Sequence, residues 1–245
     1  MTGAESAGPP VPESDLAAQF YRDCYQKVFN DQGFVGWSYR KTHRAVEANH
    51  RPDARAEILE IGAGTGEHLA FVTQAFARYV MVDLSPEPAD PPWRNDERVT
   101  WVQGDVSAPI LEGQQFDRVI SMCVLHHLRD TEAALRNIRT WLKPGGTFTF
   151  FLPSDPGFLN RLNRSLFVTP RARRLGFAHY PVVNAREHHN HYWGLKEELL
   201  YEFRDFDVRR SYWPLGIPLA DLSVYSVWNV TKPRAATTAV AEARE

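Results

Sequence analysis

The residues best placed to do chemistry lie in the stretch from Ile58 to Leu69, an apolar run that ends in three glycines and continues amphipathically. Gly62, Gly64 and Gly66 are spaced G-x-G-x-G. Glycine takes positive φ angles readily and lets a ligand approach the backbone, while a following helix would offer its N-terminal N–H groups. The pattern predicts a strand, a tight turn and a helix that bind a nucleotide-like ligand.

The same stretch argues against a dinucleotide. The fingerprint G-x-G-x-x-G needs glycine or alanine at position 67. Glu67 stands there and would place a carboxylate where the pyrophosphate sits. An NAD-dependent oxidoreductase is therefore an alternative rather than the first hypothesis.

Further motifs follow the glycines in a fixed order: Val80–Asp83, Val102–Val106, Phe116–Ser121 and Leu142–Gly146. In this order the motifs resemble those of the class I S-adenosylmethionine (SAM) dependent methyltransferases, of the small-molecule type found among sugar and natural-product enzymes. The resemblance covers residues 55–152 strongly. It implies S-adenosyl-L-methionine as the cofactor and a small-molecule acceptor for its methyl group.

The resemblance also implies the cofactor contacts. Glu60 would accept a hydrogen bond from the cofactor's ammonium or orient the glycine loop, Asp83 would bind the two ribose hydroxyls, and Asp105 would accept from the adenine amino group. An acid that ends a strand is otherwise often a helix cap. The predicted cofactor site consists of Glu60, Gly62, Gly64, Gly66, Asp83, Leu84, Asp105, Val106 and Met122.

Two groups of histidines are candidates for the acceptor side. Methyl transfer from a sulfonium is an in-line displacement, and only a poor nucleophile such as a hydroxyl needs a base. His126 and His127 directly follow the predicted fourth strand and are predicted to be catalytic, one of them as the general base. Several relatives use one of these positions only to bind the backbone, so a structural role stays open.

The second group lies between Glu187 and Trp193, in a segment expected to roof the acceptor pocket. The predicted substrate-binding residues are His188, His189, His191 and Tyr192. His189 and His191 are two residues apart, but no completing carboxylate or cysteine is evident, so no metal is predicted. Five arginines between 161 and 174 form either a solvated face or a contact for an anionic acceptor.

The elements that must position these groups alternate between strand and helix. We expect strands at 58–61, 79–83, 99–103, 117–121, 147–152, 207–212 and 223–230, and helices at 38–48, 66–76, 131–142 and 195–203. Pro86, Pro88, Pro91 and Pro92 forbid a regular helix after the second strand. The fold class is α/β: a Rossmann-like, seven-stranded, mostly parallel sheet with helices on both faces and the last strand antiparallel.

The predicted methyltransferase domain spans 14–232, between tails at 1–13 and 233–245 that are expected to be disordered. It includes an N-terminal helical cap at 14–50 and an acceptor-side insertion at 153–194. In the family that the sequence resembles, such a cap often closes over the cofactor, so that Tyr21 and Tyr39 could reach it. Aromatic residues at helical spacing are more often core residues, and these two are left out of the predicted site.

Composition limits the partners and the compartment. With 28 basic and 30 acidic residues the formal net charge is -2, so neither nucleic acid nor a membrane surface is an expected partner. The only two cysteines, Cys24 and Cys123, fit free thiols in the cytoplasm. The sequence does not indicate an oligomeric state.

These observations predict a SAM-dependent methyltransferase of a small molecule, and the preferred hypothesis is O-methylation of a sugar or secondary-metabolite hydroxyl. An N- or C-methyltransferase of a small molecule is the nearest alternative. A non-catalytic SAM-binding module is the remaining one.

Overall fold

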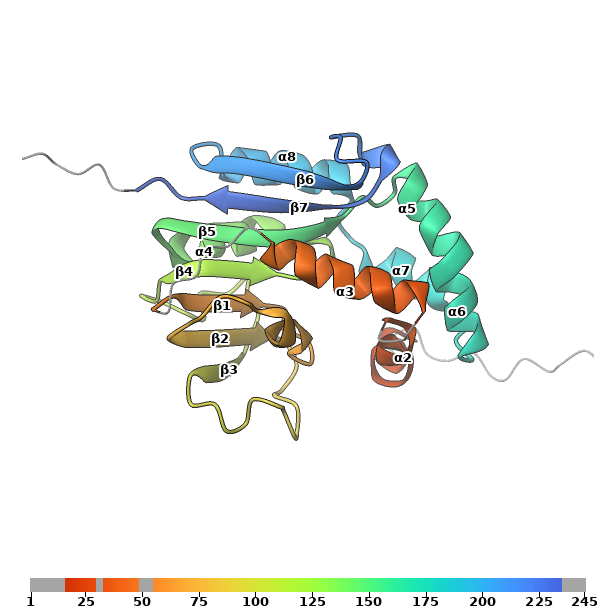
Figure 1. Cartoon of the computed structure of the whole chain (residues 1–245), viewed down its shortest axis with the longest axis horizontal. Helices are drawn as coiled ribbons and strands as arrows, with labels where there is room; N and C mark the ends of the chain where they lie inside the picture. Colours follow the sequence, from red (N-terminus) through yellow and green to blue (C-terminus); the bar gives the residue numbers. More distant parts are fainter. Residues whose placement is uncertain (1–15, 30–32, 49–54, 235–245) are drawn as a thin grey trace, which may run out of the picture.

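A seven-stranded sheet forms the centre of the computed structural model, which describes residues 16–29, 33–48 and 55–234 (Figure 1). The strand order is β3-β2-β1-β4-β5-β7-β6. The first five strands pair in parallel, and β7 is antiparallel to both β5 and β6, as predicted. The strands are β1 (Glu57–Ile61), β2 (Arg78–Asp83), β3 (Val99–Gln103), β4 (Phe116–Ser121), β5 (Leu142–Pro153), β6 (Asp207–Pro214) and β7 (Ser223–Thr231).

The sheet is covered on both faces because its inner strands carry apolar side chains on both sides. On one face, α4 (Thr131–Trp141) and α8 (Tyr192–Glu202) pack over a core that includes Trp228. The side chain of Asp130 caps α4 by accepting the Ala133 N–H at 2.9 Å, as expected for an N-cap. Along β7, Trp228 and Val230 belong to this core, whereas Tyr225 and Val227 belong to the core of the opposite face.

That opposite face is covered by α3 (Phe34–Glu47), drawn in orange in Figure 1. Val46 of α3 packs with Ile58 and Ile120 in a second core cluster. The helix begins one turn earlier than the predicted 38–48, after Gly33 in an extended conformation.

The helix predicted at 66–76 is wrong. Only a 3₁₀ turn forms there, Glu67–Phe71, and Val72 is already extended. The backbone N–H of Thr73 is directed to the Glu47 carboxylate at 3.3 Å, a tertiary contact that replaces the helical hydrogen bond. Two β-branched residues in succession, Val72 and Thr73, also weaken the helix. The proline-rich stretch 84–98 contains no helix, as predicted.

The N-terminal helices pack against the insertion rather than against the sheet. Here α1 (Leu16–Gln19), a π-helical segment (Phe20–Cys24) and α2 (Tyr25–Phe29) meet α5 (Phe158–Asn163), a second π-helical segment (Arg164–Val168), α6 (Thr169–Arg174) and α7 (Tyr180–Glu187). They share a third core cluster containing Phe20, Phe177 and Tyr180. Arg171 fastens the two segments by donating to the carbonyl oxygens of Val28 and Lys27 at 3.0 and 2.7 Å.

The predicted tail 1–13 and residues 235–245 of the second tail lie outside the described residues, so the expectation of disorder there stays a prediction. Among the helices that are described, none combines the length and the apolar character needed to cross a membrane.

Candidate active site

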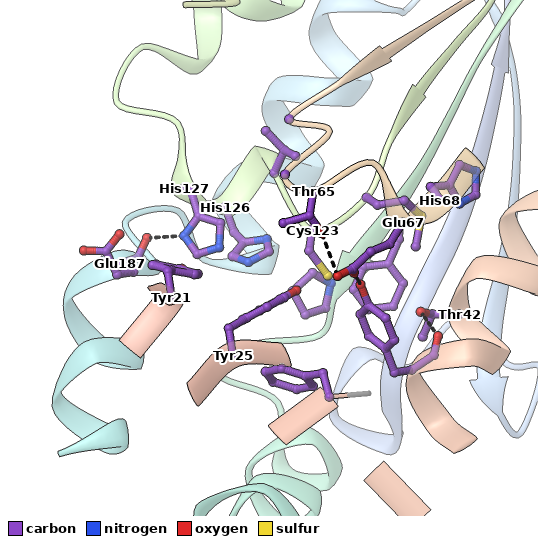
Figure 2. Close-up of a pocket in the computed structure, with 18 of the residues that line it drawn as sticks. Tyr21, Tyr25, Thr42, Thr65, Glu67, His68, Cys123, His126, His127 and Glu187 are labelled. Carbon is purple, nitrogen blue, oxygen red and sulfur yellow. Dashed lines mark hydrogen bonds between the residues drawn. The ribbon is translucent and has the colours of Figure 1, made fainter. Parts of the chain in front are cut away.

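A cavity of about 870 Å³ opens where the carboxyl ends of β1, β2 and β4 meet the N-terminal helices and the insertion. Ligands of open α/β sheets bind at this edge, where the strand order reverses. Figure 2 shows side chains from these separate parts of the chain pointing into the same space. Of the predicted cofactor residues, all but Gly66 line it: Glu60, Gly62, Gly64, Asp83, Leu84, Asp105, Val106 and Met122.

The glycine loop has the conformation that the sequence predicts. Gly62, Gly64 and Gly66 all have positive φ, at 64°, 60° and 74°. At Gly64 a Cβ would meet nothing within 4 Å, so open space for a ligand lies beside the backbone. At Gly66 a Cβ would lie 2.1 Å from the Trp93 ring, so this glycine serves packing behind the loop. A 3₁₀ turn follows in place of the expected helix N-terminus.

Asp83 joins the second strand to the glycine loop. One carboxylate oxygen accepts the Gly64 N–H and the other accepts the Ser85 N–H, both at 2.8 Å. A carboxylate has about four lone-pair sites, so capacity for two hydroxyls remains. Asp105 likewise accepts the Ser107 N–H at 2.8 Å. Both acids therefore stabilise their own loops and still face the cavity.

Glu60 is the most deeply placed acid of the cavity, with 1% of its surface exposed. It accepts a hydrogen bond from the Tyr79 hydroxyl at 2.7 Å. Burial raises the pKa of the Glu60 carboxyl, because the charged form loses solvation. A cationic ligand group beside it would offset this cost.

A buried polar network joins α3 to the 3₁₀ turn that follows the glycine loop. Glu47 accepts from Arg118 at 2.9 Å and pairs with His68 at 3.1 Å. His68 in turn meets His43, with their Nδ1 atoms 2.9 Å apart. Burial lowers the pKa of His43 to about 3, so it is neutral at pH 7. Although burial opposes it, hydrogen bonds and charge from His68 and Arg118 lower the pKa of Glu47 to about 2.

Tyr21 and Tyr39, which are not part of the predicted site, both line the cavity. Tyr25 lines it as well, close to Tyr21 (Figure 2). Tyr39 donates to the Glu67 carboxylate, which also accepts from Thr65 at 2.8 Å. Burial raises the pKa of all three tyrosines, so they remain phenols. Helical spacing of aromatics is the same for core and for cavity walls, so the sequence held no signal for this.

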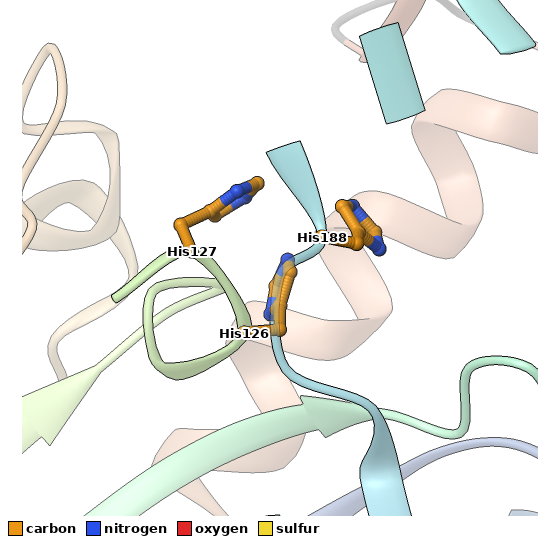
Figure 3. Close-up of side chains that lie close together, drawn as sticks. All are labelled: His126, His127 and His188. Carbon is orange, nitrogen blue, oxygen red and sulfur yellow. The ribbon is translucent and has the colours of Figure 1, made fainter. Parts of the chain in front are cut away.

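His126 and His127 lie together on the acceptor side of the cavity, and His188 joins them from the end of α7 (Figure 3). The ring centroids of His126 lie 4.1 Å from His127 and 4.3 Å from His188. Nδ1 of His127 donates to the Glu187 carbonyl oxygen at 2.8 Å, and Nδ1 of His188 donates to the Asp155 carboxylate at 2.9 Å. These acceptors assign a proton to Nδ1 of each ring, and in the neutral His127 ring the lone pair is then on Nε2.

Burial holds the pKa of His126 well below its ordinary value, and the neighbouring His127 and His188 add to this. Burial, followed by His188, lowers the pKa of His127 to about 4. Both rings are therefore neutral at pH 7. Asp155 has its pKa held far below the usual range by His188 and Arg164, which outweigh its burial.

Three predicted substrate residues lie elsewhere. His189 and His191 are exposed and do not line the cavity. Tyr192 is buried in α8, where its hydroxyl donates to Tyr212 at 3.2 Å in the core on the other face of the sheet. The chain turns between His188 and Tyr192, so neighbours in the sequence face different sides. Only His188 of this group reaches the cavity.

The structure adds residues that the sequence did not single out. Cys123 lines the cavity with φ at 56°, a left-handed conformation unusual for a residue with a side chain and common at functional sites. Burial raises the pKa of its thiol to about 12. Asp155, held by Arg164 at 2.7 Å, positions His188 from 33 residues earlier. No local motif marks either residue.

The fold and this cavity define a Rossmann-like α/β protein with a nucleotide-type site at the strand ends. Residues 59–150 match a family described as a methyltransferase domain. A relative, highly reducing polyketide synthase 2 of Gibberella zeae, is 31% identical over 158 residues, which cover 56% of this chain and 6% of the synthase. The chain thus spans only a small part of that relative.

Solved structures share this fold. N-methyltransferase NodS from Bradyrhizobium japonicum, in complex with S-adenosyl-L-homocysteine, has a TM-score of 0.54 at 15% identity, covering 86% of this chain and 100% of NodS. The CurJ carbon methyltransferase has a TM-score of 0.57 at 16% identity, covering 91% of this chain and 68% of CurJ. Residues 59–150 thus match a methyltransferase domain, and solved methyltransferases share the fold of the chain.

Proposed function

We propose that the protein transfers the methyl group of SAM to a hydroxyl of an apolar secondary metabolite. The observation that carries this is the cluster of His126, His127 and His188 beside the strand ends, under a roof of aromatic side chains. A hydroxyl has to lose its proton as it attacks the methyl group, whereas an amine only has to be neutral. A site rich in neutral imidazole therefore suits a hydroxyl better than an amine.

The lining favours a metabolite over a free sugar. Many of the residues that the N-terminal helices and the insertion contribute to the lining are aromatic or aliphatic: Phe20, Tyr21, Tyr25, Phe29, Phe34, Val168, Tyr180 and Val183. Such a surface gains from burying apolar area and leaves most hydroxyls of a sugar without partners. The arginines predicted as a possible anion contact contribute only Arg164, which is paired with Asp155.

We assign the predicted roles on the cofactor side as part of the same proposal. Asp83 would bind the ribose hydroxyls, Asp105 and Val106 would flank the adenine, and Glu60 would face the ammonium group. Leu84, 70% exposed, lies at the cavity edge beside Pro86 and is suited to cover the adenine ring. His126 and His127 keep their predicted catalytic role, in that the acceptor's proton is lost at the histidine cluster.

C-methylation is the second candidate, and the comparisons favour it. The matched relative is a polyketide synthase, and one structure of this fold is a carbon methyltransferase. A carbon between two carbonyl groups also has to lose a proton before it attacks. The same cluster therefore suits it, and the methylated atom in the product decides between the two.

The test has two stages. Mass spectrometry of small molecules released from the purified protein should detect SAM or S-adenosyl-L-homocysteine, and calorimetry should show SAM binding. The protein is then incubated with SAM carrying a deuterated methyl group and a panel of phenols, alcohols, β-dicarbonyl compounds, amines and sugars. A labelled O-methyl product from an apolar acceptor is expected. Labelling of amines alone, or no SAM binding, would refute the proposal, and hydride transfer from a nicotinamide would point to the oxidoreductase alternative.

A further inference from the structure

The three histidines have an arrangement that goes beyond a single proton acceptor. One ring nitrogen from each of His126, His127 and His188 lies within 4.8 Å of the other two, and the three rings approach from two segments 61 residues apart (Figure 3). We propose that these three imidazoles bind one divalent transition-metal ion of the zinc type, with its open position facing the acceptor. This rests on the proposed function and specifies how the acceptor loses its proton.

The spacing of the nitrogens suits such an ion after small side-chain rotations. Zinc binds imidazole nitrogen at about 2.0 to 2.1 Å in a tetrahedron, so bound nitrogens lie roughly 3.4 Å apart. The nitrogens now lie within 4.8 Å of one another, so metal binding draws them together by roughly 1 Å. Imidazole is also a ligand that zinc accepts readily.

The groups around the rings are those that accompany metal-bound histidine. A ligating histidine almost always donates its second ring N–H to a carboxylate or a backbone carbonyl, which orients the ring. His188 donates to Asp155 and His127 donates to the Glu187 carbonyl oxygen. Two of the three rings are therefore held in the orientation and the tautomer that binding through Nε2 requires.

The third ring has the polar atom that lacks a partner. His126 is 3% exposed, and its Nδ1 has no hydrogen-bond partner within the described part of the chain. An unpaired nitrogen in such a buried place costs free energy, and a metal ion would remove that cost. Arg164 is the nearby cation that would repel the ion, but its charge is paired with the Asp155 carboxylate at 2.7 Å.

The site has the composition of a catalytic rather than a structural metal centre. Three protein ligands with a fourth position open to a cavity are typical of catalytic zinc, whereas structural zinc has four. The acceptor oxygen would occupy the open position, where the ion lowers the pKa of its hydroxyl. Its proton then passes to water, an oxygen lone pair forms the bond to the methyl carbon, and the electrons of the broken C–S bond return to sulfur.

This inference departs from the sequence-based expectation that no metal is bound. That expectation considered the pair His189 and His191, which lie outside the cavity. The trio that the fold assembles contains neither of them. The two exposed histidines therefore serve as matched controls.

In the experiment, native protein is freed of metal with a chelator and titrated with two ions. Calorimetry measures the binding of Zn²⁺, and visible absorption measures the binding of Co²⁺. We expect one ion per chain and an intense visible band typical of tetrahedral Co²⁺. His126→Ala, His127→Ala and His188→Ala should each abolish the band, and Asp155→Asn should weaken Zn²⁺ binding by roughly 10- to 100-fold. His189→Ala and His191→Ala should bind as the wild type does.

SAM calorimetry on every variant verifies that the fold is retained. No stoichiometric Zn²⁺ binding by the wild-type protein, or loss of binding in the control variants, would overturn the metal site. Full methyl transfer by the chelated enzyme on its identified acceptor would overturn the role in activating the acceptor. In that case the proposed methylation stands. Failure to bind SAM would instead refute the proposed function, while the metal titration would still test the metal site.

Discussion

The two halves of the cavity are built in different ways. The half that we assign to the cofactor (the cofactor half) consists of the ends of β1, β2 and β3 and the loops that follow them, with one acid at each: Glu60, Asp83 and Asp105. The half that we assign to the acceptor (the acceptor half) combines the N-terminal helices, the β4 loop and the insertion. Local chain geometry determines the first half, while packing between distant segments determines the second. Substitutions should therefore affect either the cofactor or the acceptor and seldom both.

The substitution expected to have the largest effect on turnover without an effect on SAM affinity is that of His127. His127→Ala should lower turnover by about 10² to 10⁴, the usual cost of losing a group that assists proton removal. SAM affinity should stay at the wild-type value, because no cofactor contact is assigned to this ring. Single-turnover kinetics on the identified acceptor, with calorimetry for SAM, measure both quantities. His189→Ala is the control, and turnover within a few fold of wild type in His127→Ala would leave this histidine a structural role only.

Asp83 should give the converse result. Asp83→Ala removes the acceptor proposed for two hydroxyls and the partner of the Gly64 N–H, a loss of about 1.5 to 3 kcal/mol, or roughly 10- to 150-fold in the Kd for SAM. Asp90, exposed in the following loop, provides the matched control Asp90→Ala. Calorimetry that finds unchanged SAM affinity in Asp83→Ala would remove Asp83 from the cofactor site.

The buried network of His43, His68 and Glu47 should make folding stability depend on pH. His43 has its pKa lowered to about 3 in the folded state, against about 6.5 when unfolded, so the unfolded chain binds more protons between these values. The contribution of His43 to stability is therefore complete above pH 6.5 and falls as the pH is lowered, by about 2 kcal/mol from pH 7 to pH 5. The lowered pKa values of His126 and His127 add losses of the same sign. Below about pH 4.5, protonation of Glu47 adds to the loss, since its folded pKa is about 2.

Urea unfolding at pH 7 and pH 5 measures this dependence. His43→Phe keeps a ring stacked on Phe71, whose centroid lies 4.7 Å from that of His43, and removes the titrating group. Its stability should change less between the two pH values than that of the wild type. An equal change in both proteins would show that His43 does not carry the effect.

The smallest effect is expected in the aromatic wall. Tyr21→Ala should raise the Michaelis constant for the acceptor by roughly 2- to 13-fold, which corresponds to about 0.5 to 1.5 kcal/mol for the loss of one aromatic contact. SAM affinity should not change. Tyr201, exposed on α8, supplies the control Tyr201→Ala. A loss of SAM affinity in Tyr21→Ala, with an unchanged Michaelis constant, would place Tyr21 in the cofactor half.

The same division explains what the sequence could predict. Strand ends with acids and glycines are local features, so the sequence placed Gly64, Asp83 and Asp105 together with their strands, and all three line the cavity. The helix α4 and the strand β7 were predicted close to their observed bounds, because their patterns extend over several residues. The helix expected after the glycine loop failed because Glu47 of α3 binds the Thr73 N–H, a contact between distant segments.

The acceptor half had no such pattern. His188 and His189 are adjacent and of the same type, yet one lines the cavity and the other is exposed, because the chain leaves α7 between them. Tyr21 follows the same helical spacing as the buried Phe20 and Cys24. Which face of a short helix borders a cavity depends on what packs opposite it, and that information is absent from the local sequence.

The shared core of the N-terminal helices and the insertion has a consequence for transplanting acceptor preference between related enzymes. Phe20 and Val28 come from one segment, and Phe177 and Val183 come from the other, yet they form one cluster closed by Arg171. A chimera that exchanges only one segment would pair unmatched surfaces and expose part of this cluster. Residues 16–29 and 158–187 should therefore be exchanged together in such a chimera, while the glycine loop and its acids are kept unchanged.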